Sequence, residues 1–241
     1  INGNGSDNVL FGGDGNDILN GGTGNDTLFG GDGNDNVNGG MGDDSLMGGT
    51  GNDIYYVDSG NDQIIELQGE GTDIVYSTID YTVTANVENL TLQGTAINGT
   101  GNDANNTIIG NGSDNVLIGG EGNDNVNGGA GNDTLFGNDG NDELNGGAGN
   151  DSLMGGLGND IYYVDSGNDQ IIELQGEGTD TINSTLDYTL VGTFLENLTL
   201  QGTAINGTGN ESNNTINGNG SDNVLIGGDG NDILNGGTGN D

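Results

Sequence analysis

Residues 12–53 have the sequence GGDGNDILN-GGTGNDTLF-GGDGNDNVN-GGMGDDSLM-GGTGND, one nine-residue phrase repeated without interruption. Aspartates recur every nine residues, at Asp17, Asp26, Asp35, Asp44 and Asp53. Each follows the third glycine of its phrase by two residues and precedes an apolar or aromatic residue by two. Glycines and one carboxylate in strict register cannot build an ordinary core, but they suit a stack of identical turns lined with oxygen atoms. The pattern therefore favours metal binding.

The composition alone is typical of a disordered polyanion. The chain has 241 residues, of which 54 are glycine and 29% are apolar, and its net charge is −38 with no lysine, arginine or histidine. Low hydrophobicity with high net charge usually indicates disorder, but the strict periodicity favours a folded chain. No residue can neutralise a phosphate, which excludes nucleic acid as a direct partner. No apolar run approaches the ~20 residues that a membrane helix needs, so we expect no membrane insertion.

The sequence contains few residues that could act as catalytic groups. Without histidine, cysteine or lysine, the usual pairs of nucleophile and base cannot be assembled. Carboxylate pairs such as Asp43–Asp44 or Glu66–Glu70 are nominal candidates for glycoside hydrolysis, but turn ligands or solvated side chains explain them better. We expect that the chain is not an enzyme.

A larger period lies over the nonapeptide. Residues 52–73 recur identically at 159–180, and residues 1–26 recur at 216–241 with one change, Phe11 to Ile226. We expect one continuous solenoid with repeat unit 1 at 1–107 (β-roll block 1–76, looser β stretch 77–107), repeat unit 2 at 108–215 (block 108–183, looser stretch 184–215) and the start of unit 3 at 216–241. Because the opening of the unit returns at residues 216–241, we expect a slice of a longer tandem array or a segment of a fibre.

The phrase G-G-x-G-x-D-x-U-x, with U apolar, suits a turn of six residues followed by a very short strand. Two phrases make the halves of a flattened 18-residue coil whose U side chains meet inside. We place U at Val9, Leu19, Leu28, Val37, Leu46, Tyr55, Ile64 and Val75. Stacking about 13 coils some 4.8 Å apart would give an all-β rod of about 60–65 Å with parallel strands. Three glycines in nine exclude a helix, since each costs ~1 kcal/mol.

The looser stretches also have the pattern of strands. Ile79, Tyr81 and Val83 alternate with polar residues. We expect the same solenoid to continue there with wider coils and fewer metal turns; a small separate subdomain is the alternative.

Stacked coils would place Asp17 over Asp35 and Asp26 over Asp44, one coil apart. Carboxylates that close repel each other unless a cation lies between them. A set of carboxylate and carbonyl oxygens is what Ca²⁺ prefers, whereas Zn²⁺ and copper would lack thiol or imidazole ligands and Mg²⁺ demands a stricter octahedron. The sequence therefore predicts several bound calcium ions.

The phrase resembles the calcium-binding nonapeptide of the RTX (repeats-in-toxin, haemolysin-type) family. The resemblance implies a right-handed parallel β-roll, in which Ca²⁺ ions lie between stacked turns that each contribute an aspartate and two carbonyls. Full matches to the phrase are Asp17, Asp26, Asp35, Asp44, Asp53, Asp124, Asp133, Asp142, Asp151, Asp160, Asp232 and Asp241. Weaker matches are Asp7, Asp62, Asp73, Asp103, Asp114, Asp169, Asp180 and Asp222. At Asn106 and Glu211 another residue stands where an aspartate is expected, so metal is not expected there.

These observations favour a structural role. We expect a secreted or cell-surface calcium-binding segment that folds on extracellular Ca²⁺ into a stalk, surface layer or fibre, with further copies of itself as partners. The alternative is a secretion and folding module of a larger toxin, protease or lipase exported by type I secretion. Ice binding and carbohydrate binding by an adhesin are minor alternatives, since the third position of the phrase forms no regular row of threonines.

Overall fold

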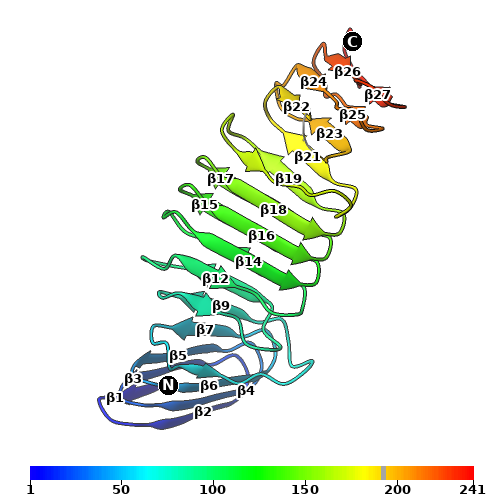
Figure 1. Cartoon of the computed structure of the whole chain (residues 1–241). Helices are drawn as coiled ribbons and strands as arrows, with labels where there is room; N and C mark the ends of the chain where they lie inside the picture. The colour runs from blue at the N-terminus through cyan, green and yellow to red at the C-terminus, as the bar shows by residue number, and fades with distance from the viewer. Residues whose placement is uncertain (191–193) are drawn as a thin grey trace.

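The computed structural model describes residues 1–190 and 194–241, which form one elongated solenoid of parallel β-strands (Figure 1). The described residues contain 27 strands and no helix. A helix able to cross a membrane is accordingly absent from this part of the chain. The all-β parallel solenoid predicted from the nonapeptide is confirmed.

The strands alternate between two faces of the rod. Odd-numbered strands form one 14-stranded sheet that runs the length of the described chain: β1 (Asn2–Asn4), β3 (Ile18–Thr23), β5 (Asn36–Met41), β7 (Ile54–Val57), β9 (Ile74–Ser77), β11 (Asn89–Leu92), β13 (Thr107–Ile109), β15 (Asn125–Ala130), β17 (Glu143–Ala148), β19 (Ile161–Val164), β21 (Thr181–Ser184), β23 (Asn197–Leu200), β25 (Thr215–Asn217) and β27 (Ile233–Asn235). Even-numbered strands form the opposite face: β2 (Val9–Asp14), β4 (Thr27–Asp32), β6 (Ser45–Thr50), β8 (Gln63–Ile64), β10 (Tyr81–Thr82), β12 (Asn98–Thr100), β14 (Val116–Glu121), β16 (Thr134–Asp139), β18 (Ser152–Leu157), β20 (Gln170–Ile171), β22 (Tyr188–Thr189), β24 (Asn206–Thr208) and β26 (Val224–Ile226). This face is divided into three sheets, with breaks after β8 and after β20.

Within the nonapeptide blocks each coil except the last has 18 residues, as predicted. Leu19 is paired with Val37 on one face, and Leu28 with Leu46 on the other. All four side chains are fully buried, and they belong to one ladder of apolar residues inside the rod. The prediction was wrong at Val9, which is 60% exposed, because Leu10 and not Val9 is paired with the inward Leu28.

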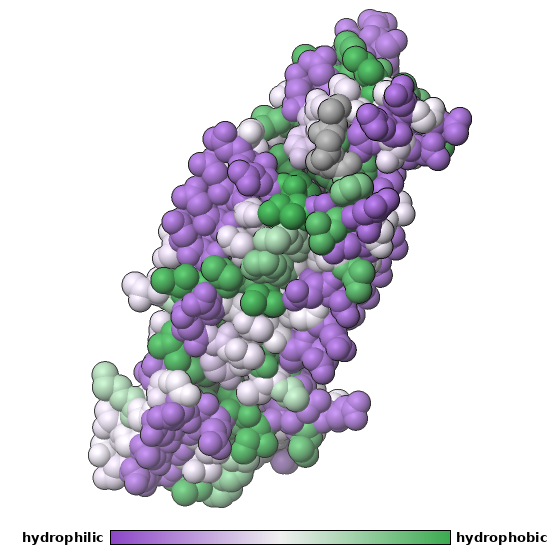
Figure 2. Space-filling view, viewed as in Figure 1, coloured by the Kyte–Doolittle hydropathy of each residue, from purple (hydrophilic) through white to green (hydrophobic). Residues whose placement is uncertain are grey.

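Glycine is required where the turns of adjacent coils approach each other. Gly22 and Gly24 have φ values of 110° and 115°, in the left-handed region that other residues rarely adopt. A Cβ atom on Gly22 would also collide with the Asn4 carbonyl oxygen of the preceding coil. These turns follow the edges of the rod, and hydrophilic residues cover most of its long edges in Figure 2.

The looser stretches belong to the same solenoid, because β9, β11 and β13 continue the 14-stranded sheet. The coil lengths differ from the prediction. Asp53 and Asp73 are 20 residues apart at the end of the block, but the next coil, from Asp73 to Glu88, has only 15 residues and is not wider. In unit 2 the corresponding coil, from Asp180 to Glu196, has 16 residues. The extra residue of the second large period therefore falls in this coil, part of which (191–193) lies outside the described residues.

Candidate metal centre

Two columns of polar side chains run along the rod, each residue immediately before a strand. The first column precedes the odd-numbered strands and comprises Asp17, Asp35, Asp53, Asp73, Glu88, Asn106, Asp124, Asp142, Asp160, Asp180, Glu196, Asn214 and Asp232. The second column is at the opposite edge, before the even-numbered strands and at the C-terminal residue, and comprises Asn8, Asp26, Asp44, Asp62, Asn115, Asp133, Asp151, Asp169, Asn223 and Asp241. The short strands and glycine turns thus hold one polar side chain per coil along the first edge. The second column is interrupted in the looser stretches, where Ile97 and Ile205 precede β12 and β24, and where the exposed Asp80 and Asp187 before β10 and β22 accept from the following coil instead.

One oxygen of each column carboxylate is held by the backbone of the preceding coil. The N–H of Asp17 donates to Asp35 Oδ1 at 2.7 Å, and the N–H of Asp35 donates to Asp53 Oδ1 at the same distance. The second column repeats this bond from Asp26 to Asp44 Oδ1 at 2.7 Å. The stacking of these aspartates one coil apart, predicted from the sequence, is confirmed.

In most of the column aspartates the other oxygen has no partner, whereas Oδ2 of Asp62 and of Asp169 accepts from backbone N–H groups of its own turn. Among the described residues, the buried Oδ2 atoms without a hydrogen bond include those of Asp17, Asp26, Asp35, Asp44, Asp53, Asp73, Asp124, Asp133, Asp142, Asp151, Asp160 and Asp180. An unsatisfied buried polar atom costs about 1–3 kcal/mol, and a charged one costs more. Because the chain has no lysine, arginine or histidine, only a bound cation or a proton can neutralise these groups.

The unpaired oxygens face backbone oxygens across spaces that only glycine leaves open. A Cβ atom on Gly30 would collide with Asp35 Oδ2 and would lie 2.5 Å from the carbonyl oxygen of Gly48 in the next coil. The same arrangement recurs at Gly128, beside Asp133 Oδ2 and the Gly146 carbonyl. Carboxylate and carbonyl oxygens converging on one space form the ligand set that suits Ca²⁺. The residues present therefore fit calcium.

Burial raises the pKa of several carboxyls in the middle of the columns. It raises the pKa of Asp124 and Asp160 to about 7, and that of Asp44 and Asp53 to about 6. Hydrogen bonds from the preceding coil lower these pKa values, and neighbouring carboxylates raise them further. The charged form is therefore disfavoured in the folded chain near neutral pH unless a cation compensates it.

Asparagines occupy the columns where the looser stretches meet the nonapeptide blocks. Asn106 Nδ2 donates to the Glu88 carbonyl at 3.1 Å, and Asn115 Nδ2 donates to the Ile97 carbonyl at 3.1 Å. Asn214 and Asn223 make the corresponding bonds in the second unit. An amide therefore satisfies carbonyls that would otherwise need another partner.

The predicted aspartates separate into two groups. Those within the columns are Asp17, Asp26, Asp35, Asp44, Asp53, Asp62, Asp73, Asp124, Asp133, Asp142, Asp151, Asp160, Asp169, Asp180, Asp232 and Asp241. Asp7, Asp114 and Asp222 lie one residue earlier, where each accepts from the backbone N–H of an exposed asparagine one coil later. Asp103 is exposed and lines a surface cavity of about 310 Å³. These four aspartates are not brought together with the columns.

Sequence reasoning missed the glutamates of the first column. The Asp73 N–H donates to Glu88 Oε2 at 2.9 Å, and the Asp180 N–H donates to Glu196 Oε2 at 2.9 Å. Both glutamates follow the shortened coils, where a longer side chain occupies the aspartate position. Their signal in the sequence was the paired LEN and VEN segments, which lack any glycine phrase.

Comparison with known proteins identifies the repeat. The family profile of the RTX calcium-binding nonapeptide repeat matches residues 1–28, 29–64, 100–135, 136–171 and 208–241. No curated protein matches the chain. The matched segments contain the glycine phrases, and the gaps between them are the looser stretches and the ends of the blocks that precede them.

Proposed function

Because the chain belongs to the RTX calcium-binding nonapeptide repeat family, we propose that it is a secreted structural segment whose fold is completed by extracellular calcium. In this role it is a rigid stalk, a part of a surface layer or a part of an extracellular fibre. The calcium ligands we propose are the column aspartates together with the glycine carbonyls that face them. For Asp7, Asp103, Asp114 and Asp222, ligation remains a prediction from spacing alone.

The observation that carries the proposal is the set of unpaired Oδ2 atoms inside a continuous rod. The 14-stranded sheet passes through both looser stretches without a break, which supports a single solenoid over a string of separate domains. A rigid rod whose charges require calcium suits a mechanical element outside the cell. We propose the same division into units 1–107, 108–215 and 216–241, with further copies extending the same ladders.

Calcium concentration makes this fold conditional. Extracellular calcium modules bind with dissociation constants of about 0.1–1 mM. At ~1 mM Ca²⁺ and a dissociation constant of ~0.1 mM, each site adds roughly 1.4 kcal/mol to the stability of the folded chain. Cytosolic calcium is far lower, so the polyanion would stay unfolded inside the cell and fold after export.

The surface favours the structural role over ice binding. The register places Asp14, Asp32 and Thr50 in one row along the rod, and Thr23 and Met41 in another. Neither row is a flat array of threonines. A carboxylate from Asp32 instead accepts a hydrogen bond from the Thr50 hydroxyl at 3.0 Å.

Electron microscopy of the surface of the source tests the proposal. From Asp17 to Asp124 the first column advances by six coils, through Asp35, Asp53, Asp73, Glu88 and Asn106, so one unit spans about 29 Å at ~4.8 Å per coil. We expect stalks or filaments with this axial repeat that disappear when calcium is chelated. Detection of the chain only as part of a released toxin, protease or lipase would instead support the secretion module.

A further inference from the structure

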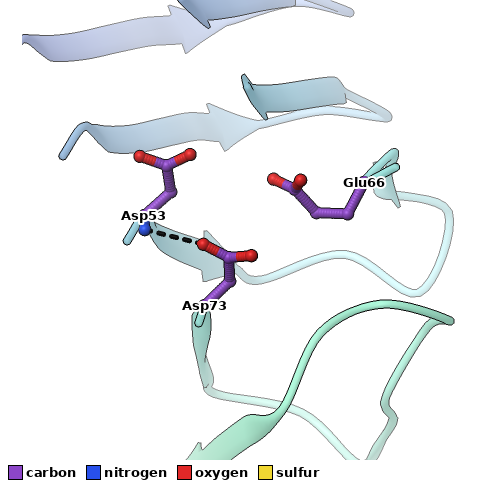
Figure 3. Close-up of side chains that lie close together, drawn as sticks. All are labelled: Asp53, Glu66 and Asp73. Carbon is purple, nitrogen blue, oxygen red and sulfur yellow. Dashed lines mark hydrogen bonds between the residues drawn. The ribbon is translucent and has the colours of Figure 1, made fainter. Parts of the chain in front are cut away.

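Each nonapeptide block ends in a coil that differs from the others. Asp53 and Asp73 are 20 residues apart, yet the Asp53 N–H still donates to Asp73 Oδ1, at 2.8 Å (Figure 3). In the first three turns of the block, at Gly12, Gly21 and Gly30, the carbonyl of the next coil faces the first glycine, as Gly48 does toward Gly30. At Gly48 itself the Tyr55 hydroxyl takes this place beside Asp53 Oδ2. The last turn of the block has therefore exchanged a backbone ligand for a side-chain hydroxyl.

A third carboxylate enters this coil from the even-numbered face, at the position one coil after Gly48. Glu66 follows β8, the last strand of its sheet, and points toward Asp53 and Asp73 in Figure 3. Its Oε1 accepts a hydrogen bond from the Tyr55 hydroxyl, which in turn accepts from the Gly48 N–H at 2.5 Å. These bonds fix the orientation of the glutamate.

The remaining oxygens of the three carboxylates have no partner. Asp53 and Asp73 are fully buried and Glu66 is 7% exposed, and Asp53 Oδ2, Glu66 Oε2 and Asp73 Oδ2 make no hydrogen bond. One oxygen from each residue lies within 4.8 Å of the others. Three buried carboxylates this close together must be neutralised by a cation or by a proton.

The second unit contains the same cluster. Asp160, Glu173 and Asp180 bring their oxygens within 4.8 Å of one another, and their free oxygens are again unpaired. The Tyr162 hydroxyl donates to Glu173 Oε1 and accepts from the Gly155 N–H at 2.6 Å. The arrangement is thus a repeated feature of the unit and not an accident of one coil.

We propose that Asp53, Glu66 and Asp73, and likewise Asp160, Glu173 and Asp180, each hold an interior Ca²⁺ ion that joins the two faces of the rod at the end of a nonapeptide block. The ligand set consists of carboxylate oxygens with a nearby tyrosine hydroxyl, which suits a hard divalent cation. The ion would hold the rod together where the even-numbered face is interrupted, after β8 and after β20.

Burial supports the need for a cation at these clusters. Desolvation raises the pKa of Glu66 to about 7 and that of Glu173 to about 8, and the neighbouring aspartates raise both further. The rival to a metal ion is therefore a protonated glutamate that binds nothing. A neutral, isosteric substitution distinguishes the two, because it leaves a protonated network nearly unchanged but removes a metal ligand.

The test counts calcium ions bound by the full chain, using equilibrium dialysis with ⁴⁵Ca²⁺. We expect the double variant Glu66→Gln/Glu173→Gln to bind two ions fewer than the unchanged chain, and each single variant to bind one fewer. The control Glu121→Gln/Glu211→Gln makes the same change in charge at two exposed glutamates and should bind the full number. An unchanged count in both double variants would overturn the interior sites.

A second measurement uses the tyrosines as reporters. Terbium replaces calcium in oxygen sites and luminesces when a nearby tyrosine is excited, and Tyr55 and Tyr162 contact the proposed ligands directly. The glutamine double variant should lose most of the luminescence that these two tyrosines sensitise, and equal emission would contradict the proposal. The inference rests on the proposed calcium-dependent fold, but the two can be tested separately. If neither the unchanged chain nor any variant bound calcium, the proposed function would be refuted. If all of them bound equal amounts, only the interior sites would be refuted.

Discussion

Replacing Asp142 by asparagine tests the column directly. Its Oδ1 accepts from the Asp124 N–H at 2.7 Å, and its own N–H donates to Asp160 Oδ1 at 2.8 Å. Asparagine retains an acceptor for the first bond and leaves the second intact. The change therefore removes one negative charge and one unpaired oxygen, and the natural asparagine at Asn106 shows that a column asparagine still donates its backbone N–H to the next coil.

The magnitude follows from the coupling between calcium binding and folding. For each ion bound only by the folded chain, a tenfold rise in calcium above the dissociation constant adds about 1.4 kcal/mol to the free energy of unfolding. Asp142 lies between Asp124 and Asp160 and can contribute to the ions on either side. The Asp142→Asn variant should therefore gain about 1.4–2.8 kcal/mol less than the unchanged chain over that tenfold range.

Urea denaturation at about 1 and 10 mM calcium, followed by circular dichroism, measures this difference. The control is Asp139→Asn, which removes the same charge from an exposed residue of the same turn. It should show the full gain. If Asp142→Asn showed the same calcium dependence as the control, the column aspartates would not be the ligands.

The remaining predictions concern protons, the glycine spaces and the core. In chelator, β structure should increase as pH falls, because burial raises the pKa of Asp124 and Asp160 to about 7. The stability that protonation gives the fold is complete below the unfolded pKa near 4 and is lost as pH rises through about 7. A circular dichroism titration that showed less β structure at acidic pH would contradict this. Gly39→Ala should lower the free energy of unfolding in calcium by about 1–3 kcal/mol, since its Cβ would collide with the Asp44 carboxylate. The matched control in the same urea titration is Gly60→Ala, whose Cβ meets no atom within 4 Å. Leu144→Ala should cost about 2–5 kcal/mol in calcium by that assay, because the side chain is fully buried in the ladder; a loss below 1 kcal/mol would mean that the core is not close-packed.

The regular part of the fold was predictable because one phrase determines it. Fixed spacing of Leu19, Leu28 and Val37 sets the 18-residue coil, and the same spacing stacks the aspartates. The prediction was wrong at Val9, where the register shifts by one residue. It also missed Glu88, where the phrase loses its glycines and the coil shortens. Such changes depend on which backbone groups of the neighbouring coil are free, and spacing within one segment does not reveal that.

The interior clusters were beyond sequence reasoning for a different reason. Glu66 is 13 residues from Asp53, at the position one coil after Gly48, where the phrase has a glycine and therefore predicts no side chain. The identical recurrence of residues 52–73 at 159–180 was a visible signal, but it did not indicate which carboxylates meet. The position of Tyr55 beside Gly48 identifies the coil where a side chain takes the place of a backbone ligand.

The central claim is that calcium supplies the charge that this chain lacks and so completes its fold. Far-ultraviolet circular dichroism of the full chain at neutral pH, recorded first in chelator and then in millimolar calcium, tests it most directly. We expect a disordered spectrum in chelator that changes cooperatively to a β-rich spectrum as calcium is added. A β-rich spectrum that is the same with and without calcium would contradict the claim.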